Sequence, residues 1–242
     1  MQTINPQKPR KLRFRSSVKK IISLPKSIYV NFRCLDWHVA WRLPLLVSWR
    51  TRLTILRRGV IRFEETPRRF QVKIGFGESE AVVARRSNLC LLGGTIRFLG
   101  SADFGEGISL CNAGQMEIGD GCFFNANCTL WCSDRITLGR ELLGGWNVLL
   151  RDDDGHAIVQ NGEALASHAP IVLGDHCWLC ANTAILKGAG LGNDCVLSYG
   201  AVLTKAWPEN HQMLGGVPAK PIRQDVDWVR WQEGPSAEEK AP

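Results

Sequence analysis

The chain has 242 residues, 45% of them hydrophobic, which is enough to bury a sizeable core. It has no run of about twenty apolar residues, which excludes a membrane-spanning helix of the usual kind. Its N-terminus also lacks an apolar segment followed by a small-residue cleavage site. We therefore expect one elongated cytoplasmic domain with extensions at both ends.

The N-terminal third is strongly basic. Residues 1–70 hold seventeen Lys and Arg against three Asp and Glu, a net charge of +14, whereas the rest of the chain carries −7. Such a segment favours an anionic surface. The run of basic residues contains no recognisable nucleic-acid-binding motif, so we expect no nucleic-acid partner.

Residues 1–58 are predicted to form a basic arm and a cap. The arm covers residues 1–24, and residues 25–58 hold a short helix or irregular cap over the open end of the fold that follows. Trp37, Trp41 and Trp49 lie in this partly apolar segment. The alternative interpretation is contact with an anionic membrane surface, which would make the protein peripheral at the inner face of the membrane.

Residues 59–205 contain a six-residue repeat, which is irregular at first and clean from about Met116. An aliphatic residue stands at every sixth position in Leu173, Leu179, Ile185, Leu191, Leu197 and Leu203. In an α-helix this spacing would place successive residues about 240° apart, whereas in extended chain it keeps them on one face. Small residues recur four positions later, at Cys177, Thr183, Ala189, Cys195 and Ala201. The pattern predicts an all-β solenoid of short stacked strands with a narrow core.

The repeat is interrupted once by a long segment. It also runs through Ile118, Phe124, Leu130 and Ile136, slips by two residues to Leu138, and breaks between Leu150 and Leu173. That gap of twenty-three residues is not a multiple of six, so residues 151–170 are predicted to leave the stack as a loop. Loops on rigid scaffolds commonly carry function.

Nine cysteines are present, and four of them occupy the inward small-residue position: Cys122, Cys128, Cys177 and Cys195. We interpret these four as reduced core residues. The Cys177-x-x-Cys180 spacing is also found in half of a zinc site or in a redox pair, but the repeat already accounts for Cys177. We predict no metal site.

Several ordered motifs resemble one family. The run Leu173-Gly-Asp-His-Cys-Trp178, the later Leu203-Thr204-Lys205 and Gly216-Val-Pro-Ala-Lys220 resemble the hexapeptide-repeat acetyltransferases, most closely the bacterial O-acetyltransferases of capsule, lipopolysaccharide and exopolysaccharide sugars. The resemblance covers roughly residues 90–225. It implies a left-handed parallel β-helix with three hexads per turn, acetyl-CoA as acyl donor, a sugar or polysaccharide acceptor, and a homotrimer with sites between subunits.

His156 is the predicted general base. Acetyl transfer to a hydroxyl needs a group that accepts the hydroxyl proton, and a neutral imidazole does so near pH 7. Asp152 and Asp154 precede it by four and two residues, and either could orient the imidazole. The plain alternative is that Asp154-Gly155 makes a turn with His156 exposed beside it. The resemblance favours catalysis, because the histidine of an Asp-x-Asp-x-His loop is that family's base; the oxyanion donor is expected to be a backbone amide.

Trp178 is a further candidate, because the same position in other hexads holds small or aliphatic residues. The resemblance places it in the active site; the alternative is packing on a neighbouring subunit. The resemblance also implies contacts to the acyl donor from Ala181, Tyr199, Thr204, Lys205, Lys220 and Arg223. The lysines and arginine suit the phosphates of CoA.

Three other functions remain open. N-acetylation of an amino or nucleotide sugar would use the same base and donor, a non-catalytic scaffold would use only the fold, and a zinc-dependent hydratase would need three converging histidines. Residues 206–242 are predicted to form a C-terminal extension, polar and disordered from Glu233 to Pro242.

Overall fold

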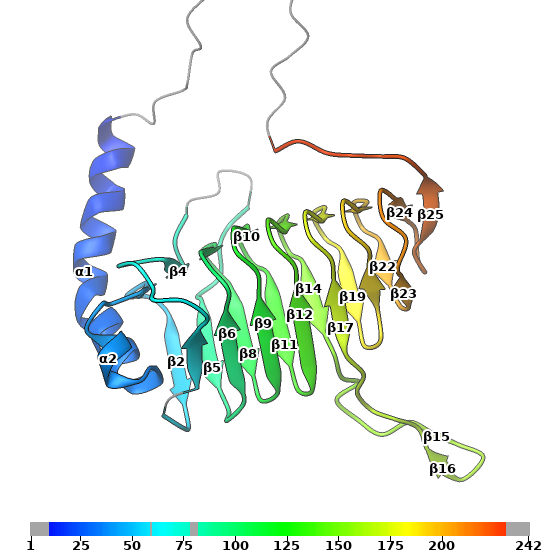
Figure 1. Ribbon diagram of the computed structural model, residues 1–242, viewed down its shortest axis with the longest axis horizontal. Coiled ribbons are helices and arrows are strands. Elements are labelled where there is room, and N and C mark those ends of the chain that lie inside the picture. Colours follow the sequence, from blue (N-terminus) through cyan, green and yellow to red (C-terminus); the bar gives the residue numbers. More distant parts are fainter. Residues whose placement is uncertain (1–9, 59, 78–81, 231–242) are drawn as a thin grey trace, which may run out of the picture.

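The computed structural model describes residues 10–58, 60–77 and 82–230; within it, side chains are described from Ser17 onward. Two helices lie at one end of a long stack of short strands (Figure 1). The expected arm over residues 1–9 and the expected disorder from Glu233 to Pro242 lie outside the described residues.

Twenty-three of the strands form three sheets that run along the stack, so that each turn of the chain contributes one strand to each sheet. The first sheet contains β1 (Leu45–Val47), β4 (Val72–Ile74), β7 (Ala102–Phe104), β10 (Cys122–Phe124), β13 (Leu143–Gly144), β18 (Trp178–Leu179), β21 (Val196–Leu197), β24 (Met213–Gly215) and β25 (Lys220–Arg223). The second contains β2 (Arg52–Ile55), β5 (Asn88–Leu91), β8 (Ser109–Asn112), β11 (Thr129–Cys132), β14 (Leu149–Arg151), β19 (Ala184–Leu186) and β22 (Val202–Leu203). The third contains β3 (Ile61–Phe63), β6 (Thr95–Phe98), β9 (Gln115–Ile118), β12 (Arg135–Leu138), β17 (Ile171–Leu173), β20 (Gly190–Leu191) and β23 (Ala206–Trp207).

Pairing within the sheets is parallel except between β24 and β25. In β7 and β10, Phe104 lies opposite Phe124, so one turn takes twenty residues; in β19 and β22, Ile185 lies opposite Leu203, so one turn takes eighteen. The longer turns place two inward residues on each third-sheet strand, as Ile136 and Leu138 do on β12. This explains the two-residue slip of the repeat.

The inward column confirms the six-residue pattern. The six aliphatic residues from Leu173 to Leu203 are at most 4% exposed, and the five small residues between them are equally buried. Gly144 occupies an inward position because a Cβ there would lie 2.4 Å from Cδ1 of Phe124 in the preceding turn. The solenoid prediction is therefore confirmed, and the four cysteines of the inward position are buried in its core.

The N-terminal region differs from the prediction. Helix α1 (Arg10–Cys34) is continuous through Pro25, and a short α2 (Trp37–Ala40) follows it. The predicted arm over residues 1–24 is thus helical in its described part. The coils begin at β1 rather than at residue 59, because Leu45, Leu46 and Val47 are buried and pair in register with β4.

The loop predicted between Leu150 and Leu173 leaves the stack after β14. It carries the hairpin of β15 (Val159–Gln160) and β16 (Glu163–Ala164), which projects from the side of the solenoid (Figure 1). The turn residues Asn161 and Gly162 have φ of 53° and 86°, values that suit a two-residue Asn-Gly turn. At the other end, the coils continue past residue 205 through β23 and β24, so the C-terminal extension begins later than expected.

Candidate active site

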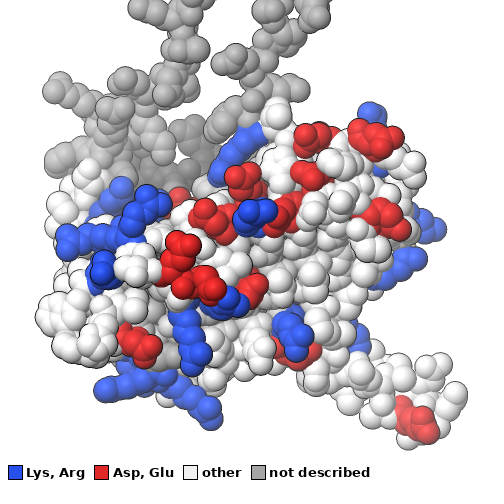
Figure 2. Space-filling model, in the orientation of Figure 1, with Lys and Arg blue, Asp and Glu red and all other residues white. Residues whose placement is uncertain are grey.

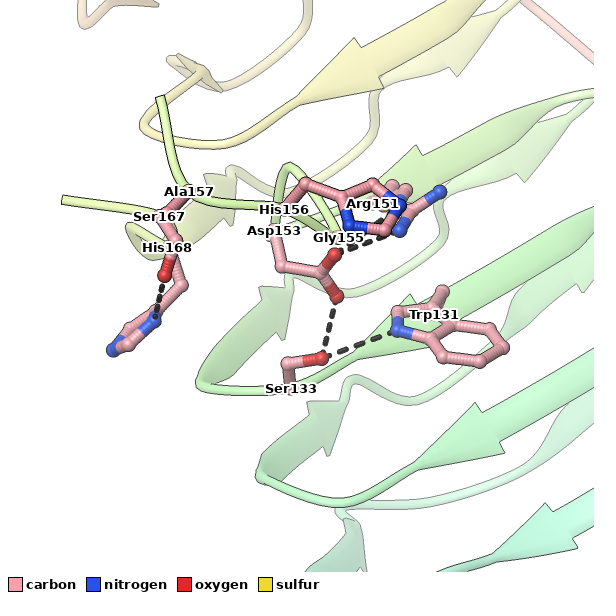
Figure 3. Close-up of a pocket in the computed structure, with 9 residues that line it drawn as sticks. All are labelled: Trp131, Ser133, Arg151, Asp153, Gly155, His156, Ala157, Ser167 and His168. Atoms are coloured by element: carbon pink, nitrogen blue, oxygen red, sulfur yellow. Dashed lines mark hydrogen bonds and ion pairs between the residues drawn. The ribbon is translucent and has the colours of Figure 1, made fainter. Parts of the chain in front are cut away.

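A pocket of about 470 Å³ lies where the extruded loop meets the stack (Figure 3). It opens at the corner between the second and third sheets, since the loop joins β14 to β17. Its lining residues come from this loop and from the preceding turn: Trp131, Ser133, Arg151, Asp153, Gly155, His156, Ala157, Ser167 and His168.

The base of the loop is closed by backbone pairing between its two ends. The N–H of Asp154 donates to the carbonyl of Ser167 at 2.8 Å, and the N–H of Ala169 donates to the carbonyl of Asp152 at 3.0 Å. These bonds bring His156 and His168, twelve residues apart, to the same pocket.

Asp152 anchors the loop to the preceding turn. Its side chain is fully buried, with one carboxylate oxygen accepting from the N–H of Ser133 at 2.7 Å and the other from the N–H of Asp134 at 2.9 Å. It makes no hydrogen bond to His156, so the expectation that Asp152 orients the imidazole finds no support in this geometry. Its contacts are those of a structural residue.

Asp153 is the acidic residue that lines the pocket. It accepts hydrogen bonds from the Ser133 hydroxyl at 2.5 Å and from Arg151 at 2.8 Å (Figure 3). Partial burial acts to raise the pKa of Asp153, but the hydrogen bonds from Ser133 and Arg151 outweigh it and lower the pKa below its ordinary value. Asp153 is therefore a carboxylate throughout the neutral range.

Trp131 and Arg151 form one wall of the pocket. The Arg151 guanidinium lies 5.7 Å from the Trp131 ring centre, and the indole N–H donates to the Ser133 hydroxyl at 3.1 Å. One of these contacts joins neighbouring turns and the other lies within a turn, and together they form a wall that offers both a flat ring and a cation.

His156 lies on the loop at the mouth of this pocket, directly after Gly155, whose φ is +75°. Its side chain is exposed and makes no hydrogen bond to any side chain or backbone group in the described part of the chain. An imidazole with both nitrogens available can accept a proton from a bound hydroxyl. The turn interpretation of Asp154-Gly155 and the catalytic interpretation of His156 are thus compatible.

The carboxylate of Asp154 lies against Lys187 rather than His156. The Lys187 ammonium donates to Asp154 and to the carbonyl of Ala166, and so joins the loop to the next turn. The predicted orienting role of Asp154 is therefore not seen in this arrangement. Asp152 and Lys187 together attach the loop to the turns on both sides of it.

Trp178 lies on β18 in the first sheet and does not line the pocket with His156. Its ring is 5.9 Å from that of Trp228. Trp228 in turn stacks on His176 at 4.4 Å and donates to the carbonyl of His176. Within one chain, the C-terminal segment covers one side of Trp178.

The six residues predicted to contact the acyl donor lie in three different places. Ala181 and Tyr199 follow first-sheet strands and form neighbouring turns, whereas Thr204 and Lys205 follow β22 at the same corner as the His156 loop. Lys220 and Arg223 lie on β25. All except Ala181 are exposed, but one chain does not bring the six together with His156.

Sequence reasoning missed Trp131, Ser133, Arg151, Asp153 and His168 as pocket residues. The twenty-residue turn places Trp131 directly opposite Arg151 across β11 and β14. The repeat spacing predicts this register, so it is the sequence signal that could have identified Trp131 and Arg151 as neighbours.

A group of possible metal ligands lies outside the pocket. His176, Asp194 and Asp227 bring one ligand atom each within 4.8 Å of one another. His176 Nδ1 lies 3.0 Å from Asp194 Oδ1, a distance that an ordinary hydrogen-bonded ion pair explains. The absence of a metal site therefore stays a prediction.

The fold is shared with known proteins. The family described as "hexapeptide repeat of succinyl-transferase" matches residues 170–205. The crystal structure of the polysialic-acid-specific acetyltransferase NeuO superposes with a TM-score of 0.55 over 81% of this chain and 83% of that one, at 19% identity, and so shows the fold alone. The chain therefore has the left-handed parallel β-helix fold, and within it residues 170–205 match the hexapeptide-repeat model.

Its sequence relatives are acetyltransferases. It is 30% identical to the galactoside O-acetyltransferase of Escherichia coli over 47% of this chain and 56% of that protein. It is 27% identical to a putative lipopolysaccharide biosynthesis O-acetyl transferase of E. coli over 53% and 74%, and 30% identical to the polysialic acid O-acetyltransferase of Neisseria meningitidis over 44% and 50%. The matched segment spans about half the length of the first of these relatives.

Proposed function

We propose that this protein transfers the acetyl group of acetyl-CoA to a hydroxyl of a bacterial surface-polysaccharide sugar, with His156 as general base. The observation that carries the proposal is the pocket in which the Asp-x-Asp-x-His loop presents an unpaired imidazole beside a fixed aromatic and cationic wall. The O-acetyltransferase relatives supply the reaction class.

The proposed acetyl transfer passes through a tetrahedral intermediate. His156 accepts the proton of the sugar hydroxyl while the hydroxyl oxygen forms a bond to the thioester carbonyl carbon. The tetrahedral intermediate then breaks its C–S bond, and the imidazolium returns the proton to the departing CoA thiolate. A backbone amide of the coil is the proposed oxyanion donor.

Residues in and around the pocket position the loop that carries this base. Asp152 and Lys187 hold the two sides of the loop, and the charged Asp153 fixes Arg151 against Trp131. A loop held in this way keeps the imidazole near its working geometry, which lowers the entropy lost when the sugar binds.

The proposal includes a homotrimer. Within one chain, Lys205 follows β22 at the same corner as the His156 loop, whereas Trp178, Lys220 and Arg223 lie on strands of the first sheet. A site shared between neighbouring subunits would let Trp178 and these cations act with a His156 from the next chain. Exposed cations on such a groove suit the phosphates of acetyl-CoA.

An acceptor panel tests the proposal. Release of free CoA thiol from acetyl-CoA is measured with neutral oligosaccharides, sialic-acid oligosaccharides, amino sugars and nucleotide sugars. Release with acceptors that offer only hydroxyls supports O-acetylation. Release only with amino sugars would replace it by N-acetylation, and no release with any acceptor would leave the scaffold interpretation.

Peripheral association with an anionic membrane surface also belongs to the proposal. Within the described residues, neither helix is long and apolar enough to cross a bilayer.

A further inference from the structure

Helix α1 differs from an ordinary surface helix, because it exposes a stripe of apolar side chains and buries several polar ones. The face against the solenoid carries Ser23, Ser27 and Asn31, each at most 1% exposed, beside the fully buried core residues Val30 and Cys34. The opposite face is apolar and exposed: Ile21 65%, Ile22 53%, Ile28 44%, Tyr29 55% and Phe32 39%. At about 100° per residue, these five side chains fall within an arc of about 120°.

The buried polar face has a clear structural role. Strand β1 lies at the edge of the first sheet, and its outer backbone groups would otherwise lack partners. Ser23, Ser27 and Asn31, spaced by four residues, accept from the N–H groups of Trp49 at 3.0 Å, Val47 at 2.9 Å and Leu45 at 3.1 Å. Thus α1 caps the first turn with hydrogen bonds and leaves its apolar side outward.

Helix α2 and the residue that follows it enlarge this apolar surface. Trp37 is 62% exposed and Trp41 is 64% exposed, and Trp41 packs edge-on against Phe32 with ring centres 5.0 Å apart. We name the surface formed by Ile21, Ile22, Ile28, Tyr29, Phe32, Trp37 and Trp41 the end face. Because α1 and α2 lie at the end of the stack, the end face points away from the coils (Figure 1).

The charge around the end face is positive. Residues 1–58 contain fourteen Lys and Arg and one acidic residue, Asp36. Exposed members next to the apolar side chains in sequence include Lys20 and Arg42. Figure 2 shows several blue side chains and few red ones at this end of the molecule, whereas the two colours are mixed along the coils.

We infer that the end face docks on an anionic phospholipid bilayer, with the helix lying in the membrane interface. Tryptophan and tyrosine favour the boundary between headgroups and acyl chains, and flanking Lys and Arg attract anionic lipids. A second copy of the same end is a poor occupant, because its charge has the same sign. This inference rests on the membrane association included in the proposed function and names the surface that makes it. It does not depend on acetyl transfer, so vesicle binding and activity can fail separately.

Vesicle binding tests the inference without acetyl-CoA or sugar. The full chain is incubated with vesicles of equal parts phosphatidylglycerol and phosphatidylcholine, and with phosphatidylcholine vesicles, and is then sedimented. We expect binding to the anionic vesicles that weakens as NaCl is raised. The triple variant Ile21→Ser, Ile22→Ser, Ile28→Ser should lower the partition coefficient by more than about tenfold, because three apolar side chains no longer enter the bilayer.

A matched control variant replaces three exposed apolar residues elsewhere in the chain with Ser. Ile158, Val159 and Leu165 on the extruded loop are 51%, 63% and 44% exposed, close to the values of the three isoleucines. Their replacement by Ser should leave vesicle binding unchanged, with circular dichroism confirming that both variants fold. The inference is overturned if the full chain stays in the supernatant, or if the end-face variant binds like the parent. If the end-face substitutions lower the mass of the protein in solution but leave vesicle binding unchanged, the inference is also overturned, and the end face instead joins copies of the chain.

Discussion

The Ser133 hydroxyl donates a hydrogen bond to the Asp153 carboxylate at 2.5 Å, and so joins the wall of the pocket to the first residues of the extruded loop. Burial acts to raise the pKa of Asp153, and the hydrogen bonds from Ser133 and Arg151 overcome it. The stabilisation from a lowered pKa is present above the pKa of the unfolded state and is lost as the pH falls through the pKa of the folded state.

Ser133→Ala should therefore raise the pKa of Asp153. The variant then begins to lose this stabilisation at a higher pH than the parent during acidification. Carboxyl-carbon NMR titration of Asp153 measures the shift, and urea unfolding between pH 3 and pH 7, a range about the ordinary pKa of Asp, measures the consequence. An unchanged titration curve would show that Arg151 alone sets this pKa.

His156→Ala should fold and assemble like the parent but lose acetyl transfer by about 10² to 10⁴ in kcat, because it removes the proposed base. Steady-state thiol release is the measurement. His211→Ala, which removes an exposed histidine far from the loop in sequence, is the control. Near-parental turnover of His156→Ala would refute the assignment.

Asp152→Asn should act on stability. Both carboxylate oxygens accept from backbone N–H groups, and an Asn amide would turn one acceptor into a donor facing a donor. The expected loss is about 1 to 3 kcal/mol in the free energy of unfolding, measured by denaturant titration. Asp225→Asn, at an exposed position, should be neutral. A fully stable Asp152→Asn with lost activity would instead support the orienting role.

Reversing charge at Lys205 and Arg223 together should raise the KM for acetyl-CoA more than it lowers kcat. Both side chains are exposed, and neither forms an ion pair within the described residues. Lys205 lies 4.5 Å from the ring of Trp207, an exposed cation–π contact whose loss should cost the fold little. Lys205→Glu with Arg223→Glu is compared with Arg69→Glu, an exposed cation near the other end of the chain. An unchanged KM excludes both residues from donor binding.

Gly144→Ala should destabilise the solenoid. The added Cβ would lie 2.4 Å from Phe124 Cδ1, and overpacking of this kind costs about 1 to 3 kcal/mol. Phe124→Leu in the same chain should recover part of the loss by making room for the methyl group. Thermal or denaturant unfolding of the single and double variants measures both effects; equal stabilities would show that the turn relaxes freely.

Much of the solenoid could be predicted from the sequence, because its core residues pack against one another at a fixed spacing along the chain. Leu173 to Leu203 face inward by strand alternation, and each inward residue meets the residue one turn away, so spacing alone predicts burial. The same reasoning located the extruded loop, since a segment that breaks the period has no place in the stack. Left-handedness came only from the resemblance.

The N-terminal cap was harder to predict for a physical reason. Propensity and Pro25 argued for a short or broken helix, but Ser23, Ser27 and Asn31 are satisfied by the backbone of β1, and that edge exists only once the coils have formed. An apolar stripe on α1 would ordinarily be assigned to the core. Tertiary structure placed it outward.

The arrangement of the Asp-x-Asp-x-His loop was likewise determined partly by sequence and partly by tertiary structure. Sequence determined that His156 stands on a loop outside the repeat, beside three aspartates. Only the tertiary structure decided which aspartate does what: Asp152 meets backbone amides of the previous turn, Asp153 meets Ser133, and Asp154 meets Lys187 of the next turn. Adjacent residues in an irregular loop point in different directions, and each finds its partner through the stacking of turns about twenty residues or more apart in the chain. Spacing within the motif carries no information about those partners.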